Sequence, residues 1–147
     1  MSRVRDYFLG SIVAEEGLYH SDLQPGNMLA DPTTDTVWIL DYGQMGRLNA
    51  SQRAFVQSFV GACLAADATM AVEVLEQMGM QSSSYNRAGL GAAVHTAMAS
   101  WEGDVTQIAP VIAKIFSLCH AHGLDIELPY MHLLKGIATF EAAASYK

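Results

Sequence analysis

Apolar residues recur at helical spacing in two parts of the chain, near its start and throughout its second half. From Val4 to Gly17 the period is that of a helix, and Gly17 is a suitable C-terminal stop. The same period after Leu48 predicts five more helices. We expect these helices at Ala50–Ala65, Ala68–Met78, Tyr85–Ser100, Thr106–Ala121 and Pro129–Ala144.

Residues that start or stop helices occupy the breaks between these segments. Asn49, with Gln52 three residues later, predicts a capping box. Asp67 is placed to cap the helix that follows it, and Gly123 is placed to end the helix before it. Pro110 has no N–H to donate, so we expect its helix either to begin late or to kink.

Short apolar runs that are typical of strands lie between the two helical parts. The runs "MLA" (28–30) and "TVWIL" (36–40) are rich in strand-forming residues and flank the turn sequence "DPTTD". Pro25 and Gly26 interrupt regular structure just before the first run. This pattern predicts one small β-hairpin with a loop at each of its two outer ends.

The composition is that of a folded globule. The chain has 147 residues, 51% of them hydrophobic, which is enough to bury a core. No internal repeat, low-complexity stretch or linker divides it. We therefore predict a single domain over residues 1–147, mostly α (α+β), with about six helices and one small β-hairpin.

Charge and cysteine content exclude several classes of protein. The net charge of −7 argues against a nucleic-acid partner, because phosphate binding requires clustered Lys and Arg. Cys63 and Cys119 lie far apart, unlike zinc ligands or a disulfide framework, which favours a reducing compartment. No apolar run reaches the ~18 residues of a membrane span, and the start "MSRVRDYFLG" is not a signal peptide. We expect a soluble protein of the cytoplasm or of an organelle interior, whose apolar surplus leaves room for self-association or a peripheral membrane contact.

Three oxygen-bearing side chains flank the predicted hairpin. Asp22 lies in the loop before it, Asn27 at its start and Asp41 at its end. Because a two-stranded hairpin returns the chain to its starting end, the three should face one point. Amide and carboxylate oxygens suit Mg²⁺, which takes its other ligands from phosphates and water. We predict Asn27 and Asp41 as magnesium ligands, and Asp22 as the group that orients or deprotonates an attacking hydroxyl or water.

The segments around these residues resemble a known family. "HSDLQPGN" (20–27) resembles the catalytic loop of the UbiB/AarF family of atypical protein-kinase-like proteins, which reads like His-Ala-Asp-Pro-His-Pro-Gly-Asn. "ILDYGQMGRL" (39–48) is similar to the metal-binding segment of that family, and "GLDIELPYMHLLKGIATFEAA" (123–143) to its closing helix. The resemblance implies the C-terminal lobe of a protein-kinase-like fold and a link to ubiquinone or isoprenoid lipid metabolism.

The resemblance also implies roles for individual residues, with ATP and Mg²⁺ as cofactors. Asp22 matches the catalytic-loop aspartate, and His20 matches the loop histidine, a scaffold within the catalytic set. Asn27 and Asp41 match the residues that hold magnesium on the nucleotide, and Gly43 is the glycine of the same nucleotide-binding segment. Four neighbouring positions depart from the family pattern without removing a metal ligand: Leu23, Gln24, Tyr42 and Gln44.

A kinase-like fold normally starts with a β-rich small lobe whose lysine anchors the nucleotide phosphates. This sequence has no lysine before Lys114. We therefore expect a large lobe without its N-terminal lobe, with a separate small-lobe chain or a second copy as its partner. Catalysis by this chain alone is not expected, because phosphoryl transfer depends on positioning and charge neutralisation.

Three functions stay open. The first is a UbiB-like kinase or ATPase that binds Mg-nucleotide. The second is a catalytically inactive, pseudokinase-type scaffold or binding module that keeps the motif. The third is a small-molecule phosphotransferase of the aminoglycoside-kinase type, which shares a His-x-Asp loop with a later asparagine. Pro25 and the continuation "MGRL" (45–48) speak against the third.

The four histidines other than His20 favour structural roles. His120 and His122 are two apart and so point to different helix faces, which favours capping of a helix C-terminus over metal binding. His95 and His132 lie within helical patterns, where we expect partly buried polar side chains.

Overall fold

A computed structural model describes residues 15–34, 36–104 and 107–145. Most of the predicted opening helix, from Val4 to Gly17, lies outside the described residues. Gly17 itself has φ +69°, the left-handed backbone expected of a glycine stop. The described part contains five α-helices: α2 (Ala50–Leu64), α3 (Ala68–Met78), α4 (Arg87–Ala99), α5 (Ile108–Ala121) and α6 (Leu128–Ser145). The prediction of a mostly helical protein is confirmed.

The β-structure is more extensive than predicted. The expected hairpin forms from β2 (Met28–Asp31) and β3 (Thr36–Ile39), after the 3₁₀ turn η2 (Pro25–Asn27). Two further antiparallel pairs join β1 (Leu18–His20) to β4 (Met45–Arg47) and β5 (Gly79–Gln81) to β6 (Leu124–Ile126). The prediction of a single small hairpin is therefore wrong. Each missed strand has three residues, too few for a recognisable alternation, and its partner lies far along the chain.

Local signals set the helix starts. Asn49 and Gln52 form the predicted capping box, in which each side chain accepts a hydrogen bond from the backbone N–H of the other at 2.8 and 2.9 Å. Asp67 caps α3 as predicted. Asn86 caps α4, a role the pattern analysis missed, so this helix begins two residues later than predicted. Each cap satisfies a backbone N–H that has no partner inside its helix.

Proline and glycine set the two ends of α5. Pro110 is the third residue of the helix, where its missing N–H leaves no intrahelical bond unmade. The first of the two predicted outcomes, a late start, is therefore the observed one. After the helix, Gly123 has φ +82°, and a Cβ there would lie 2.7 Å from the Ser82 hydroxyl. This tight turn leads directly into β6.

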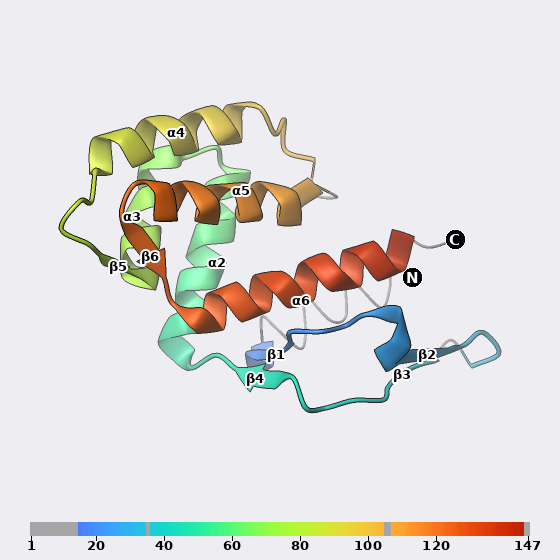
Figure 1. Cartoon of the computed structure of the whole chain (residues 1–147). Coiled ribbons are helices and arrows are strands. Elements are labelled where there is room, and N and C mark those ends of the chain that lie inside the picture. The colour runs from blue at the N-terminus through green and yellow to red at the C-terminus, as the bar shows by residue number, and fades with distance from the viewer. Residues whose placement is uncertain (1–14, 35, 105–106, 146–147) are drawn as a thin grey trace.

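The helix α6 divides the molecule into two sides (Figure 1). Helices α4 and α5 lie on one side of it, and the β1–β4 and β2–β3 sheets lie on the other. The main core fills the helical side, between α2, α3, α4, α5 and the first part of α6. Its most deeply buried members include Phe59, Leu75, Leu90, Val94, Ile115, Cys119 and Leu124.

A second core fills the space between α6 and the strands. It consists of Tyr19, Leu23, Leu48, Leu133 and Phe140. The partly buried Val56 and Ile137 pack against both cores and so join them. None of the helices in the described part of the chain is long and apolar enough to cross a bilayer.

Both cysteines are free and buried, and we predict that their thiols do not react in the folded protein. Burial raises the pKa of Cys63 to about 11 and that of Cys119 to about 12, so reactive thiolate is scarce at pH 8. Ellman's reagent should label neither thiol in the native chain and both in guanidinium chloride. Because the folded pKa values are raised, thiol ionisation favours the unfolded chain, and stability should fall as pH rises above 9. Rapid native labelling would contradict this burial.

Candidate functional site

A buried histidine joins the two motif segments. His20, at the end of β1, is fully buried. Its Nε2 lies 2.6 Å from the backbone carbonyl of Asp41, and its Nδ1 accepts a hydrogen bond from the backbone N–H of Asp22 at 3.1 Å. A carbonyl can only accept and an amide N–H can only donate, so the tautomer that satisfies both contacts carries its proton on Nε2. His20 thus links the loop carrying Asp22 to the segment carrying Asp41.

A second link runs beside the first. The backbone N–H of Ser21 donates to the carbonyl of Gln44 at 3.0 Å, and the buried Ser21 hydroxyl lies 3.0 Å from the Gln44 side-chain oxygen. Gln44 is one of the positions that depart from the family pattern. The sequence predicts no role for Gln44, and in the structure it joins the two segments through Ser21.

Asp22 and Asn27 are in direct contact. The amide nitrogen of Asn27 donates to the Asp22 carbonyl at 3.0 Å and lies 3.5 Å from the Asp22 carboxylate. Gln24, from the same loop, reaches that carboxylate at 3.4 Å. Because its nitrogen is bound to Asp22, the atom that Asn27 can offer to a cation is its amide oxygen. Both residues are half-buried.

Asp41 follows the end of β3 and is oriented by its own loop. The hairpin ladder continues past the strands, since Leu40 donates its N–H to the Asn27 carbonyl at 2.9 Å. One carboxylate oxygen of Asp41 accepts the backbone N–H of Gly43 at 2.8 Å, which leaves the other oxygen to face solvent or a ligand. A Cβ at Gly43 would lie only 3.1 Å from that bonded oxygen. The five predicted site residues are therefore connected by hydrogen bonds.

The donor set can be tested against the predicted magnesium ion. In the described ranges, no three His, Cys, Asp or Glu side chains come together as a metal cage. A site completed by phosphates and water needs fewer protein ligands than such a cage. One amide oxygen from Asn27 and one carboxylate oxygen from Asp41 are hard donors of the kind Mg²⁺ prefers. By their donor chemistry, these two oxygens suit a magnesium ion that also binds a phosphate ligand.

A glycine that the sequence analysis did not single out shapes the strand pair below the site. Gly46 lies opposite Tyr19 in the β1–β4 register. A Cβ at this position would lie 2.2 Å from the ring carbon Cζ of Tyr19. Only glycine lets the buried Tyr19 ring cover the β4 backbone. The glycine of "MGRL" thus belongs to the scaffold of the site.

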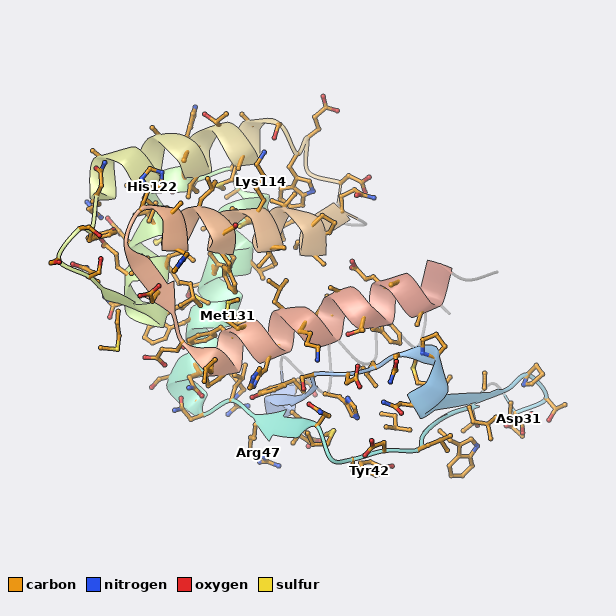
Figure 2. All side chains as sticks on the ribbon, viewed as in Figure 1. Asp31, Tyr42, Arg47, Lys114, His122 and Met131 are labelled. Carbon is orange, nitrogen blue, oxygen red and sulfur yellow. The ribbon has the colours of Figure 1, made fainter. Side chains whose placement is uncertain are left out.

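An apolar face lies open beside Asp41. Leu29 and Trp38 are opposite each other across the hairpin and are 57% and 59% exposed. Leu40 and Tyr42, on either side of Asp41, are 59% and 67% exposed. Figure 2 shows Tyr42 on the connection between the hairpin and β4. Large side chains this exposed next to a polar site are typical of a surface that contacts a ligand or partner.

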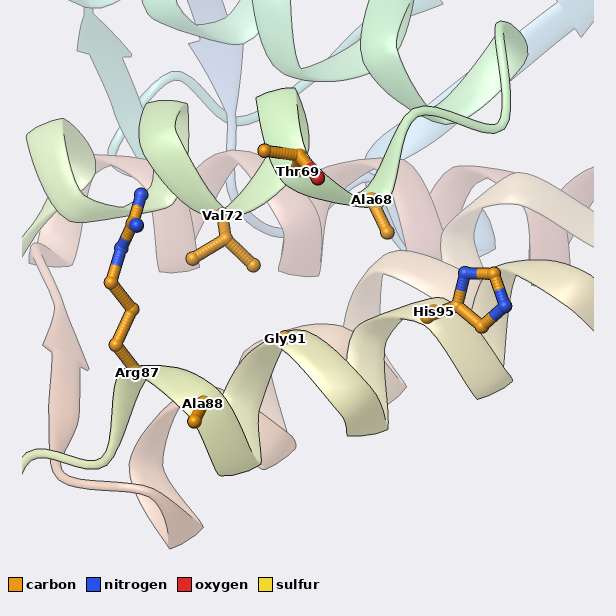
Figure 3. Close-up of a pocket in the computed structure, with 7 residues that line it drawn as sticks. All are labelled: Ala68, Thr69, Val72, Arg87, Ala88, Gly91 and His95. Carbon is orange, nitrogen blue, oxygen red and sulfur yellow. The ribbon is translucent and has the colours of Figure 1, made fainter.

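A separate pocket of about 430 Å³ lies between α3 and α4 (Figure 3). Its walls are mostly small and apolar, with Arg87 toward one end and His95 toward the other. Arg87 is held by Glu76 at 2.9 Å, which neutralises its charge. His95 is exposed, as is His132, so the expectation that both would be partly buried is wrong.

The remaining histidine pair lies at the end of α5. His120 is in the last turn of the helix, and its Nδ1 lies 2.7 Å from a carboxylate oxygen of Asp125 in β6. His122 is the C-cap residue. This placement agrees with the predicted role at a helix C-terminus. No metal cluster includes either residue within the described part of the chain.

Comparison with known proteins identifies one family. Residues 2–75 match the family model of the ABC1 atypical kinase-like domain, which covers half of the chain and both motif segments. The match agrees with the UbiB-type resemblance of the motifs and does not single out one member of the family. No curated protein and no solved structure gives a significant match.

Proposed function

The chain belongs to the ABC1 atypical kinase-like family, and on this premise we propose that it binds a magnesium–nucleotide complex and acts in phosphoryl transfer or ATP hydrolysis. The observation that carries the proposal is the bridge made by His20. One buried ring contacts the backbone of both Asp22 and Asp41 and so holds the two loops in a fixed relation. Such preorganisation is the main contribution a protein makes to phosphoryl transfer.

Asn27 and Asp41 are the residues proposed to hold magnesium. Within residues 15–34, 36–104 and 107–145, each has one side-chain oxygen left over after its hydrogen bonds. Magnesium bound there would neutralise charge on the phosphates. The role of these two side chains is to set the position of the phosphates relative to Asp22.

Asp22 is proposed to orient the attacking group. The oxygen of a hydroxyl or water attacks the terminal phosphorus, the bond to the ADP oxygen breaks, and the proton of the attacking group passes to the Asp22 carboxylate or to solvent. Gln24 and Asn27 lie near one oxygen of this carboxylate, Oδ2. Its other oxygen is the proposed acceptor.

The open apolar face fits the remainder of the ligand. Leu29, Trp38 and Leu40 offer an apolar surface next to Asp41, on which a nucleotide base can pack. We propose that the chain is a kinase-type C-terminal lobe. A separate small-lobe chain, or a second copy of this chain, would then cover the apolar surface. Because the family resemblance implies a link to ubiquinone metabolism, we also propose an isoprenoid lipid or a membrane surface as a partner.

A non-catalytic binding module is the second candidate function. It is favoured by the position of Lys114, which lies on α5, on the opposite side of α6 from the site (Figure 2). A phosphate-anchoring lysine must lie within contact distance of the nucleotide. Lys114 therefore does not supply this charge.

Thermal unfolding with nucleotide tests the proposal. Addition of ADP or ATP with Mg²⁺, at 100 times the dissociation constant, should stabilise the chain by about 2.7 kcal/mol. For a chain of this size the midpoint should rise by roughly 5 to 10 °C. The same nucleotide with EDTA should give a much smaller rise. No rise with either nucleotide would count against the proposal, and binding without ATP turnover even when a small lobe is supplied would favour the non-catalytic module.

A further inference from the structure

Helix α6 forms part of the candidate site although it lies beyond the matched segment, residues 2–75. Leu133 and Phe140 of α6 pack in the second core with Tyr19 and Leu23. Tyr19 precedes His20 in the sequence, and Leu23, which is 1% exposed, follows Asp22. Tyr19 and Leu23, which lie on either side of the His20–Asp22 segment, thus anchor it against α6.

Gly136 is the point of closest approach. It lies between Leu133 and Phe140 on the same face of α6, at helical spacing. A Cβ at this position would lie 1.9 Å from the His20 carbonyl oxygen and 3.0 Å from its carbonyl carbon. No side chain can be fitted there without moving α6 or β1 by more than 1 Å, since a relaxed contact needs more than 3 Å. The α6 backbone therefore lies directly on the residue that joins the two loops.

We propose that Gly136 is a positioning residue of the site, because it lets α6 lie against the His20 backbone and so fixes the ring that connects Asp22 to Asp41. The inference rests on the proposed function for its meaning in ligand binding. Whether the position of the His20 ring depends on the packing of α6 can be measured without any ligand.

A side chain at position 136 has a definite expected effect. It would push the His20 backbone away from α6 and lengthen the contacts of the ring to Asp41 and Asp22, now 2.6 and 3.1 Å. Loss of a group that orients metal ligands typically lowers metal affinity about 10- to 100-fold. We expect a loss of this size in the affinity for Mg–ADP.

The test compares three variants of the full 147-residue chain. Gly136→Ala adds the Cβ that meets His20. Gly91→Ala adds the same Cβ inside α4 at a glycine with open space around it. Val94→Ala lowers stability through the main core, away from His20. The readouts are the ¹⁵N NMR signals of the His20 ring, the Asp22 amide signal, the Mg–ADP dissociation constant and the unfolding midpoint.

Gly136→Ala should shift the Nδ1 and Nε2 signals of His20 and the Asp22 amide signal, while Gly91→Ala and Val94→Ala leave them in place. Unchanged His20 signals in Gly136→Ala would overturn the proposal. Equal shifts in Val94→Ala would also overturn it, because the effect would then follow lost stability alone.

A measurement on the unmodified chain covers the case in which Gly136→Ala does not fold. If α6 holds the His20 bridge, the Asp22 amide should exchange its hydrogen only when α6 opens, with the same protection as the α6 amides. A rapidly exchanging Asp22 amide beside a protected α6 would overturn the proposal. If the NMR shifts occur but the unmodified chain binds no Mg–ADP, the proposed function fails and the positioning role stands.

Discussion

Replacement of His20 by alanine is expected to lower the free energy of unfolding by about 3 to 5 kcal/mol. The side chain is fully buried, so its loss leaves a cavity. It also leaves the partly buried Asp41 carbonyl and Asp22 N–H without their present partners. Urea unfolding followed by circular dichroism measures the change, and the Mg-dependent response to ADP should be lost with it.

Two variants give this result its controls. His120→Ala makes the same replacement at a side chain that is 83% exposed and should change stability by no more than about 0.5 kcal/mol. His20→Gln supplies an amide that can donate to the Asp41 carbonyl and should recover part of the loss. If His20→Ala proves as mild as His120→Ala, the two loops are not held by this ring, and the observation that carries the proposed function fails.

Asp41→Asn is expected to abolish the stabilisation by ADP that depends on Mg²⁺. Asparagine has nearly the same shape, and its side-chain oxygen can still accept the N–H of Gly43, now bound at 2.8 Å. The loop should therefore keep its conformation, and stability without ligand should change little. The replacement removes the negative charge and the second carboxylate oxygen, which are the features proposed to bind magnesium. Thermal unfolding at several Mg²⁺ concentrations separates a loss of magnesium binding from a change in stability without ligand.

Asp31→Asn is the matched control for this experiment. Asp31 lies on the same hairpin at its outer turn, away from the site (Figure 2), and accepts a hydrogen bond from the Thr33 N–H at 2.9 Å that asparagine can also accept. Asp31→Asn makes the same change of charge as Asp41→Asn, so general electrostatic effects on nucleotide affinity would show in both variants. A full Mg-dependent response in Asp41→Asn, equal to that of Asp31→Asn, would contradict the assigned metal ligand.

The helices were predictable because the forces that place their ends act over a few residues. The box formed by Asn49 and Gln52 spans three positions, and the cap at Asp67 spans the same distance. Pro110 has no N–H to donate to a helix hydrogen bond, wherever the rest of the chain lies. For the same reason the β2–β3 hairpin, closed by a short turn, was predictable from its two apolar runs.

The site was predictable in part. The motifs name Asp22, Asn27 and Asp41, and the hairpin brings the start and end of its two strands together without help from distant residues. The motifs also marked His20 as a scaffold, but the scaffolding itself depends on burial. A histidine in a loop sequence carries no sign that its ring will be fully enclosed between two backbone groups.

By itself the sequence determined the five helices after Leu48, the caps at Asn49 and Asp67, the hairpin, and the order of the chemical groups along the chain. Only the tertiary structure decided the β1–β4 pair, the Tyr19 ring over Gly46, and the contact of Gly136 with His20. These last contacts join residues separated by 27 and 116 positions (46 − 19 and 136 − 20), so no local period or spacing encodes them. They arise because packing brings distant backbones within contact distance, and there the absence of a single carbon atom determines which arrangement fits.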